Sequence, residues 1–566
     1  MISVSSIFAQ TVLFFEKHRL WISLLFVGVV AMLFRAPYML ARTAAFSFDH
    51  GKDSIAVMHM LETGSPKFIG PWTSIPGLFF GPGWYYLLSP AYLLTGGDPM
   101  GFANTMAVLM ILCALGVTAV FGVLPGIMVA AGTTFLILSQ SAWNPFPVPI
   151  VMFGLLAMLH QIYKHPASTL QIVQYGVAGA LVGLLFHFSS AFAIFVLISM
   201  PIVFLIRKRL KPFIHPLAFG IGVGLMFLPQ LVFEVRHDFL QTRAVYSYLT
   251  ERIEGEPRRA LGEIIQISVG EITLGTLPRL DSLHLGETIP LGFSTLLALV
   301  WVVVLISTIR SKAILRYAFW PELLTIVFTS MLGFYMIHFN FWYMLGLLPL
   351  FILLDAHLVK SAHRGLVVIY IAMFLLTGMN KFLADLDLSD RPLIDAARYP
   401  VELLQASAQY NHQLLPIKIE VLNEIERRAD GRPYASYHYV PDIYDFSYNY
   451  LYLWRAKQGK TLPVDFSYKP NETIYIPEKV EILERLSSNL TPVTEKKPER
   501  LFFVVEAADN PEYLEAWWNA QPDAEIIDIA TFGALLQLYE AVPLEAKSWE
   551  AVPAEAVSSD EKERNP

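Results

Sequence analysis

Long apolar stretches separated by short polar segments fill the first two thirds of this chain of 566 residues. A helix needs about 20 apolar residues to cross the hydrocarbon core of a bilayer. Stretches approaching that length occur at residues 21–34, 103–123, 125–140, 147–163, 171–187, 189–206, 215–234, 289–309, 318–337, 341–358 and 365–380. The pattern therefore predicts an α-helical polytopic membrane protein, with about 11 transmembrane helices within residues 1–380.

One more apolar run, residues 78–94, decides the membrane topology, that is, on which side of the bilayer each loop lies. If it does not cross the bilayer, the basic residues of the short loops share a side with the basic segment before residue 21. Those loop residues include Lys164, Arg207 and Arg364. Basic residues in short loops favour the cytoplasm. We therefore expect an interfacial or re-entrant helix at 78–94, a cytoplasmic N-terminus, and a first span that is retained rather than cleaved as a signal peptide.

After residue 380 the hydropathy falls and charged residues become frequent. Helical periodicity marks residues 400–428, 443–457 and 511–519, and strand-like runs occur at 434–439, 473–476, 501–505 and 525–529. We expect a soluble, extracytoplasmic α/β domain over residues 381–544, on the periplasmic or extracellular side. Residues 545–566 are acidic and rich in Ser, Pro, Glu and Lys, a composition typical of a disordered tail.

Composition supports a membrane protein, because 55% of the residues are hydrophobic and only 16% are charged. Soluble proteins carry about 25% charged residues, so a soluble enzyme is excluded. The net charge of -7 gives no basic excess, and nucleic acid is not expected as a partner. The single cysteine, Cys113, excludes an intrachain disulfide and a cysteine-based metal site.

The polar residues that interrupt the apolar runs gather, with this topology, at the outer ends of the helices. Polar groups at membrane depth are costly and mark functional sites. Two outer loops are long: the first covers about residues 37–102 and holds interfacial helices, and the second covers residues 235–288. The candidate substrate-binding residues of this outer face are His50, Tyr85, Tyr86, Asn144, Glu234, Arg236, His237, Arg243, His338, Asn340 and Tyr343.

Two aspartates, Asp49 and Asp53, stand one helical turn apart at the start of a helix that is expected to run to Glu62 and to stop at Gly64. This spacing places both carboxylates on one face, where like charges raise one pKa or recruit a cation. Three interpretations stand. One carboxylate acts as a general base towards a hydroxyl group, the pair holds Mg²⁺ or Mn²⁺, or both are solvated with Lys52 as counter-ion.

The acidic motif around Asp49 is followed by Gly70-Pro71-Trp72, and then by Gly81-Pro82-Gly83-Trp84-Tyr85-Tyr86 at the start of the interfacial helix. Trp143-Asn144-Pro145 and the aromatic residues of the outer loops follow. This order of motifs, over residues 15–380, resembles the GT-C superfamily of membrane glycosyltransferases. It is most similar to the bacterial RgtA-like and ArnT-like branch, relatives of the protein O-mannosyltransferases.

The resemblance implies an integral-membrane glycosyltransferase of the bacterial inner membrane. Such an enzyme moves a sugar, usually with inversion, from a polyprenyl-phosphate donor to an envelope glycolipid, glycan or protein acceptor. An acidic residue of the first outer loop serves as catalytic base, and Asp49 is the matching position. Several relatives have Asp-Glu here, where this chain has Asp49-His50. The base is therefore left open between Asp49 and Asp53.

Several binding candidates have structural alternatives. Arg236, His237 and Arg243 are candidates to stabilise the departing phosphate. Alternatively, Arg236 anchors its helix at the interface, paired with Glu234 or Asp238.

Tyr343 either lines a sugar pocket or belongs to the aromatic belt of the bilayer interface, which we favour. Asn144 either caps a helix end or contacts substrate. Tyr85 and Tyr86 are expected to pack the interfacial helix in place rather than to contact sugar.

The competing function is a multi-span transporter or lipid flippase, for which intramembrane His and Arg residues would also be suitable. Many transporters are built from two related halves, and this chain shows no internal duplication. A third hypothesis is a non-catalytic scaffold whose C-terminal domain binds an envelope partner, but it leaves the acidic motif of the first outer loop without a role.

Overall fold

The computed structural model describes residues 4–165, 170–207, 214–250, 259–280, 288–337, 339–390, 414–440, 444–470, 476–487, 497–506, 511–532 and 536–544. The chain divides into two compact units. The helical unit contains residues 1–40, 106–140 and 144–386, and the sheet unit contains residues 41–105, 141–143 and 387–566. Residues 41–105, which belong to the predicted first outer loop, thus group with the C-terminal residues.

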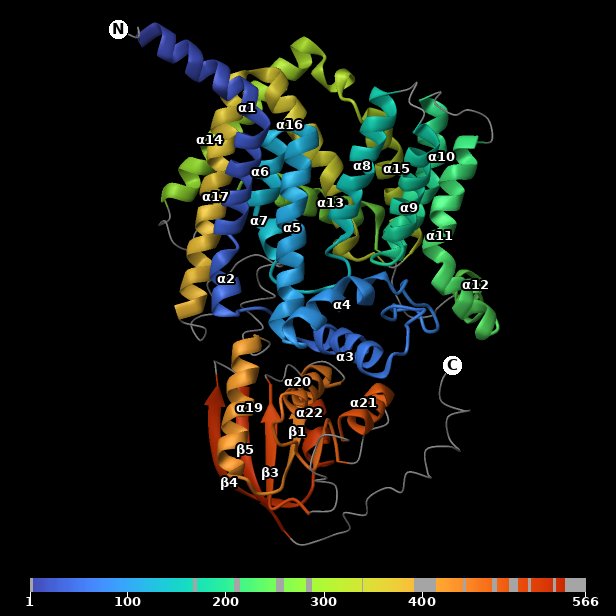
Figure 1. Ribbon diagram of the computed structural model, residues 1–566, viewed down its shortest axis with the longest axis vertical. Helices are drawn as coiled ribbons and strands as arrows, with labels where there is room; N and C mark the ends of the chain where they lie inside the picture. Colours follow the sequence, from blue (N-terminus) through green and yellow to red (C-terminus); the bar gives the residue numbers. More distant parts are fainter. Residues whose placement is uncertain are drawn as a thin grey trace. The chain divides into compact units, whose positions relative to one another are not determined.

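Long apolar helices run side by side as a bundle in the helical unit (Figure 1). The helices described there are α1 (Val4–Leu33), α2 (Ala36–Ala41), α6 (Val123–Ala131), α7 (Thr133–Ile137), α8 (Val148–Lys164), α9 (Gln171–Leu185), α10 (Ser190–Ile206), α11 (Ile214–Arg236), α12 (Leu240–Thr250), α13 (Leu261–Thr276), α14 (Thr288–Ser311), η1 (Ala313–Arg316), α15 (Trp320–Met336), η2 (Phe341–Gly346), α16 (Leu348–Ala362) and α17 (Arg364–Asp390). A further helix, α5 (Pro99–Phe121), begins in the sheet unit and continues into the bundle.

Four helices of the described chain are long and apolar enough to cross a bilayer. They are α5, α11, residues 291–311 of α14 and residues 364–383 of α17. Residues 18–33 of α1, together with α8, α9 and α10, form shorter apolar helices. These helices all lie on the apolar stretches of the sequence, whereas the total of about 11 spans stays a prediction.

The predicted span at 125–140 is not one continuous helix, because the chain is broken between α6 and α7. Gly132 has extended backbone angles, and a Cβ atom at this position would lie 2.4 Å from the carbonyl oxygen of Met128. The break leaves carbonyl groups at the end of α6 without helical donors. Arg35, which is fully buried, donates to two of them, at 2.9 Å to Ala130 and 3.4 Å to Val129.

The second predicted outer loop, residues 235–288, contains two helices, α12 and α13, and its position outside the membrane stays a prediction. Helix α13 packs against α16 and η2. Its buried residues include Ile264, Ser268 and Gly275, which fall on one helical face. The predicted span at 341–358 begins later than expected, since residues 341–346 form the 3-10 helix η2 before α16 starts at Leu348.

The sheet unit begins with α3 (Phe48–Thr63) and α4 (Gly83–Thr95), which lie within the predicted first outer loop. Its C-terminal part consists of α19 (Leu415–Ala429), β1 (Tyr434–Tyr439), α20 (Phe446–Lys457), β2 (Asp465–Ser467), α21 (Pro477–Ser487), β3 (Arg500–Val505), α22 (Pro511–Trp518), β4 (Ala524–Phe532) and β5 (Leu536–Pro543). The five strands form one sheet in the order β2-β1-β3-β5-β4. β1 is parallel to β2 and β3, and β5 is antiparallel to β3 and β4.

Both faces of β1 are buried, as expected for a parallel strand. Tyr437 and Tyr439 pack with Phe503 and with Trp517 of α22. His438, between the two tyrosines, points to the other face, where its ring stacks on a side chain of α20. Because successive side chains of a strand alternate, α22 and α20 cover opposite faces of the sheet.

Several elements of this part were predicted from the sequence and others were not. The strands β1, β3 and β4 and the helices α20 and α22 lie at the predicted residues within a few positions. The predicted strand at 473–476 lies almost entirely outside the described residues, as does the start of the predicted helix at 400–428. β2, α21 and β5 were not predicted; β2 has only three residues, too few to show a period.

Replacing Arg35 by Met should destabilise the helical unit by about 3 kcal/mol or more, since each buried polar group left unsatisfied costs about 1–3 kcal/mol. The guanidinium also donates to Ser139 Oγ at 2.8 Å. The single thiol, Cys113, is buried. Its reaction with a maleimide dye during heating therefore reports unfolding of this unit. Arg19→Met is the matched control, because Arg19 is exposed on α1. Equal melting temperatures for the two variants would contradict the role given to Arg35.

Candidate active site

Helix α3 begins at Phe48, directly after the N-cap residue Ser47. The backbone N–H of Ser47 donates to Nδ1 of His50 at 3.1 Å. This bond is one half of a capping box, in which the Ser47 side chain accepts from the backbone N–H of His50 in return. The helix ends at Gly64, which has the left-handed conformation (φ 72°) common after a helix. The expected helix from the acidic motif to Gly64 is therefore present, with Asp49 in its first turn.

The carboxylate of Asp49 is held by two donors. Lys52 Nζ lies 2.6 Å from Oδ1, and the indole Nε1 of Trp143 donates to Oδ2 at 3.0 Å. The ammonium group of Lys52 also lies 5.1 Å from the ring centroid of Phe48 and 5.0 Å from that of Trp72. The side chain of Asp49 is 38% exposed, so this carboxylate is oriented and still reachable from solvent.

Asp53 has a different environment, although it lies one turn further along the same helix. Asp53 is only 2% exposed, and its Oδ2 accepts a hydrogen bond from Nε1 of Trp84 at 2.7 Å. Burial raises the pKa of Asp53 from its ordinary value of 3.8 to about 7, although the nearby Lys52 ammonium opposes the rise. Asp53 thus holds a proton up to neutral pH, whereas Asp49 faces solvent.

A cation site between the two carboxylates finds little support in these contacts, because both oxygens of Asp49 and one of Asp53 accept from N–H groups. Within the described ranges, no group of three or more His, Cys, Asp or Glu side chains is arranged to hold a metal ion. Dependence on Mg²⁺ or Mn²⁺ stays a prediction.

The first turn of α3 packs directly against the start of α20. A Cβ atom at Gly51 would lie 2.3 Å from the backbone nitrogen of Ser447, so only glycine fits there. The ring of Phe446 meets that of Phe48 edge to face at 5.0 Å, and lies 6.2 Å from that of Trp72. Sequence analysis missed this contact; the glycine inside the acidic motif was the one available signal.

Three further candidates lie in the sheet unit. Burial in the fold lowers the pKa of His50 to about 4, an effect that Lys52 increases and Asp49 opposes. Tyr85 is buried, and desolvation raises its pKa well above the usual value. Tyr86 is 45% exposed and donates its hydroxyl hydrogen to a backbone carbonyl at 3.1 Å. Both tyrosines seat α4, the alternative that the sequence favoured.

Two candidates of the helical unit serve its backbone. Asn144 is buried, and Nδ2 donates to the carbonyl oxygen of Phe188 at 3.2 Å. Glu234 is also buried, and its carboxylate accepts from the backbone N–H of Gln241 at 2.9 Å and of Thr242 at 3.0 Å. Glu234 therefore satisfies the free N–H groups at the start of α12. Substrate contact by either residue stays a prediction.

The candidates at the end of α11 and beyond it lie at the surface of this unit. His237 stacks on the ring of Phe233 with centroids 4.0 Å apart, and its Nδ1 lies 2.9 Å from the carbonyl oxygen of the same residue. Arg236 and Arg243 are exposed. These three residues are close in sequence to Glu234, and their proposed contact with phosphate stays a prediction.

The last group of candidates lies between α15 and α16. Asn340 Nδ2 lies 3.4 Å from the hydroxyl of Tyr343. The ring of Tyr343 stacks on that of Phe334 at 5.6 Å, in an aromatic cluster of the kind that the belt alternative expects. His338 lies outside the described residues.

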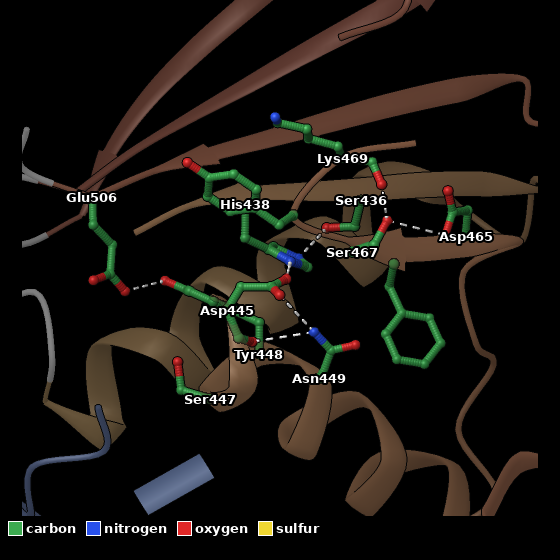
Figure 2. Close-up of polar contacts among 12 residues, drawn as sticks. Ser436, His438, Asp445, Ser447, Tyr448, Asn449, Asp465, Ser467, Lys469 and Glu506 are labelled. Carbon is green, nitrogen blue, oxygen red and sulfur yellow. Dashed lines mark hydrogen bonds and ion pairs between the residues drawn. The ribbon is translucent and has the colours of Figure 1, made fainter. Parts of the chain in front are cut away.

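A buried polar network that sequence analysis missed lies on the α20 face of β1 (Figure 2). His438 Nδ1 lies 2.5 Å from Asp445 Oδ2, and its Nε2 lies 2.9 Å from Ser436 Oγ. Asn449 donates to the other oxygen of Asp445 at 2.8 Å. The connectivity is that of a hydrolase triad, but Ser436, His438 and Asp445 are all 0% exposed. No substrate reaches the serine, so the network fixes α20 to the sheet.

A second buried group joins α19, α20 and the end of β3. The ammonium of Lys418 pairs with the carboxylate of Glu506, and both side chains are 1% exposed. Tyr448 donates to the same carboxylate at 2.9 Å, and Lys418 donates to Ser447 Oγ at 3.1 Å. Breaking one partner of such a pair costs about 3–5 kcal/mol. The pair therefore stabilises the start of α20, on which Gly51 rests.

The stability of the sheet unit should depend on pH through Asp53. The unfolded chain releases the Asp53 proton near pH 3.8, and the folded chain releases it only near pH 7. Ionisation therefore destabilises the fold progressively between these values, by at most on the order of 4 kcal/mol. The melting temperature of Asp53→Asn, relative to wild type, should rise from pH 5 to pH 8 and then level off.

Tryptophan-fluorescence melting measures this difference. Asp528→Asn is the matched control, because Asp528 is 56% exposed and its contact with Arg428 lowers its pKa. It stays ionised from pH 5 to pH 8, so its difference from wild type should be flat. A flat curve for Asp53→Asn as well would rule out the assignment of the raised pKa.

No protein-family model matches the sequence, and no curated protein is similar to it at a significant level. Solved structures do match. The crystal structure of ArnT from Cupriavidus metallidurans bound to undecaprenyl phosphate aligns over 92% of this chain and 98% of ArnT, with 10% identity and a TM-score of 0.53. ArnT in the apo state aligns over 92% and 97%, with 11% identity and a TM-score of 0.51.

A third match, to the Archaeoglobus fulgidus oligosaccharyltransferase tethered with an acceptor peptide, covers 87% of this chain and 69% of that protein, with 14% identity and a TM-score of 0.37. The fold assignment rests on the two ArnT structures. Both alignments extend over nearly the whole of this chain and of ArnT, so the similarity of fold includes the helical unit and the sheet unit. The predicted resemblance to the GT-C membrane glycosyltransferases is confirmed at the level of the fold.

Proposed function

We propose that this protein is an integral-membrane glycosyltransferase that moves a sugar from a polyprenyl-phosphate donor to an acceptor of the bacterial cell envelope. The observation that carries the proposal is the fold shared with ArnT, one of whose structures is bound to undecaprenyl phosphate. Asp49, the position that the resemblance marks as the base, is oriented by two donors and partly exposed. The same fold supports a transferase over the competing transporter or flippase.

Asp49 is the base in this proposal, and Asp53 is not. A base must be ionised and must reach the acceptor hydroxyl. Asp49 is exposed enough to do so, whereas Asp53 is buried and holds its proton up to about pH 7. In an inverting step, the acceptor oxygen bonds to the anomeric carbon while the bond from that carbon to the phosphate oxygen breaks. The hydroxyl proton passes to Asp49, and the phosphate leaves with the electron pair.

Lys52 stabilises the departing phosphate in this proposal. Its ammonium group is held beside Asp49 by two aromatic rings and is only 11% exposed in its side chain. A phosphate entering the site competes with Asp49 for this cation, and a charge-assisted bond to phosphate strengthens as negative charge develops. Transfer of the ammonium to the phosphate also frees Asp49 to accept a proton. Arg236, Arg243 and His237 remain proposed as further phosphate contacts from the helical unit.

A site for a polyprenyl donor has to lie at the boundary of the bilayer, because the prenyl chain stays in the lipid. Helix α4 has apolar residues open to its surroundings, with Leu93 68% and Leu94 86% exposed. Adjacent exposed apolar side chains of this kind are typical of a surface that contacts a membrane or a partner. We propose that α4 lies at the outer leaflet of the bacterial inner membrane, as the sequence predicted, with the sheet unit on the periplasmic side.

Asp49→Asn should reduce transfer by about 100-fold to 10,000-fold, which is the usual contribution of a general base. The measurement is mass spectrometry of envelope glycolipids, glycans and glycoproteins from cells that lack the gene and carry either the wild-type or the variant copy. The wild type should restore a sugar-bearing product that the variant does not restore. Asp528→Asn makes the same chemical change at an exposed position of the sheet unit and should restore the product fully.

Two results would contradict this proposal. Full restoration of the product by Asp49→Asn would remove this residue from the role of base. An unchanged set of envelope glycoconjugates in cells with and without the gene would argue against glycosyl transfer itself. Protein levels in the membrane, measured for each variant, separate loss of chemistry from loss of folding.

Lys52→Gln should weaken binding of undecaprenyl phosphate by roughly 10-fold to 100-fold, because a hydrogen bond to a charged group contributes about 1.5–3 kcal/mol. Purified protein in nanodiscs, titrated with undecaprenyl phosphate, measures the change. Lys460→Gln is the matched control, since Lys460 is 53% exposed and pairs with Glu426. Equal affinities for the two variants would exclude Lys52 as the phosphate contact.

A further inference from the structure

A small cavity in the sheet unit lies behind the acidic motif of α3. Its walls are largely apolar and include Phe46, Leu88 and Phe102. Two of its lining residues, His50 and Asp53, carry ionisable side chains. Asp49, with its contacts to Lys52 and Trp143, is not among the lining residues, so this cavity is distinct from the proposed base.

Each of these two lining residues has one unsatisfied atom. Nε2 of His50 and Oδ1 of Asp53 are buried and have no hydrogen-bond partner among the described residues. Leaving a buried polar atom unsatisfied costs about 1–3 kcal/mol, and more for a charged group. Two such atoms on one cavity therefore point to a ligand that satisfies both.

The hydrogen-bond pattern of His50 defines what that ligand is. Because Nδ1 accepts from the backbone N–H of Ser47, the proton of the neutral ring is on Nε2, which is a donor. A donor nitrogen has no lone pair for a metal ion, so a cation does not fit. Asp53 Oδ2 accepts from Trp84, so the proton that Asp53 keeps up to about pH 7 is on Oδ1, which is also a donor. The ligand must therefore accept from both His50 Nε2 and Asp53 Oδ1. One water molecule, with its two lone pairs, accepts both bonds.

We propose that this cavity binds one ordered water molecule, which accepts one hydrogen bond from His50 Nε2 and one from the protonated Asp53 Oδ1. A small cavity holds an ordered water when two or more polar partners line it, whereas a purely apolar cavity stays dry. The water completes a chain of hydrogen bonds from Ser47 through His50 to Asp53, and from Asp53 to the indole of Trp84.

This chain makes His50 and Asp53 positioning residues for Asp49. It ties the N-cap of α3 to its second turn and to α4, and Asp49 lies inside the turn that is tied. A shift of about 1 Å in a catalytic group can reduce a rate roughly 100-fold. The catalytic part of this inference rests on the proposed function, whereas the water site itself does not.

The first test is an experimental structure of the full chain in nanodiscs, at a resolution that shows ordered water. We expect a density peak at about 2.7–3.2 Å from both His50 Nε2 and Asp53 Oδ1. The absence of such a peak in a map that shows other internal waters would overturn the proposal. A peak contacted by three or more oxygen or nitrogen ligands at metal distances would also overturn it.

A double-mutant cycle tests the bridge in solution. His50→Phe and Asp53→Leu each remove one partner, so the melting temperature of the double variant should fall by less than the sum of the two single changes. Contacts of His50 with Ser47 and of Asp53 with Trp84 cancel in the cycle. A control cycle pairs His50→Phe with Glu62→Gln, because Glu62 binds Lys457 instead. Strictly additive effects in both cycles would show that no water links the pair.

The positioning role predicts a split between binding and transfer. His50→Phe should lower the glycoconjugate product in complemented cells by roughly 10-fold or more, and leave the affinity for undecaprenyl phosphate unchanged. His50→Gln, which can still donate to water and accept from Ser47, should restore most of the product. A fall in affinity equal to the fall in product would overturn the positioning role. Failure of the wild type to bind undecaprenyl phosphate would count against the proposed function and not against the water site.

Discussion

The close approach of two helix starts, at Gly51 of α3 and at Ser447 of α20, is the contact on which the candidate site depends. No side chain larger than hydrogen fits at Gly51, so the first turn of α3 lies against the backbone of α20. Phe446 then meets Phe48 and Trp72 around the ammonium group of Lys52. The C-terminal part of the chain thereby helps to build the surroundings of a residue in its N-terminal part.

This packing gives two aspartates of the same helix opposite properties. Each carboxylate accepts from an indole N–H, Asp49 from Trp143 and Asp53 from Trp84. Asp49 has a cation beside it and access to solvent, and Asp53 has apolar neighbours that keep its proton on up to neutral pH. Two like residues one turn apart thus differ in their surroundings: Asp53 is a buried, neutral anchor for Trp84, whereas Asp49 is the exposed carboxylate to which the proposed function gives the role of base.

Polar groups of the helical unit mostly satisfy its own backbone. Arg35 donates to carbonyl groups where α6 is broken at Gly132, and Glu234 accepts from N–H groups where α12 begins. In an apolar bundle these groups have few other partners, and unpaired backbone is costly. A charged residue at the end of an apolar stretch is therefore weaker evidence of substrate contact than the sequence alone suggests, because helix breaks and starts need the same donors and acceptors.

The sequence by itself determined the positions of the apolar helices, most strands of the sheet, and the helix that carries Asp49, because these depend on local hydrophobic period and capping. It also placed Asp49 and Asp53 together, since one turn of helix fixes their spacing. Only the tertiary structure decided which aspartate is buried, which indole donates to Asp49, and where the predicted span at 125–140 breaks. Those properties depend on Trp84, Trp143 and Arg35, whose contacts lie tens of residues away in sequence and leave no periodic trace in it.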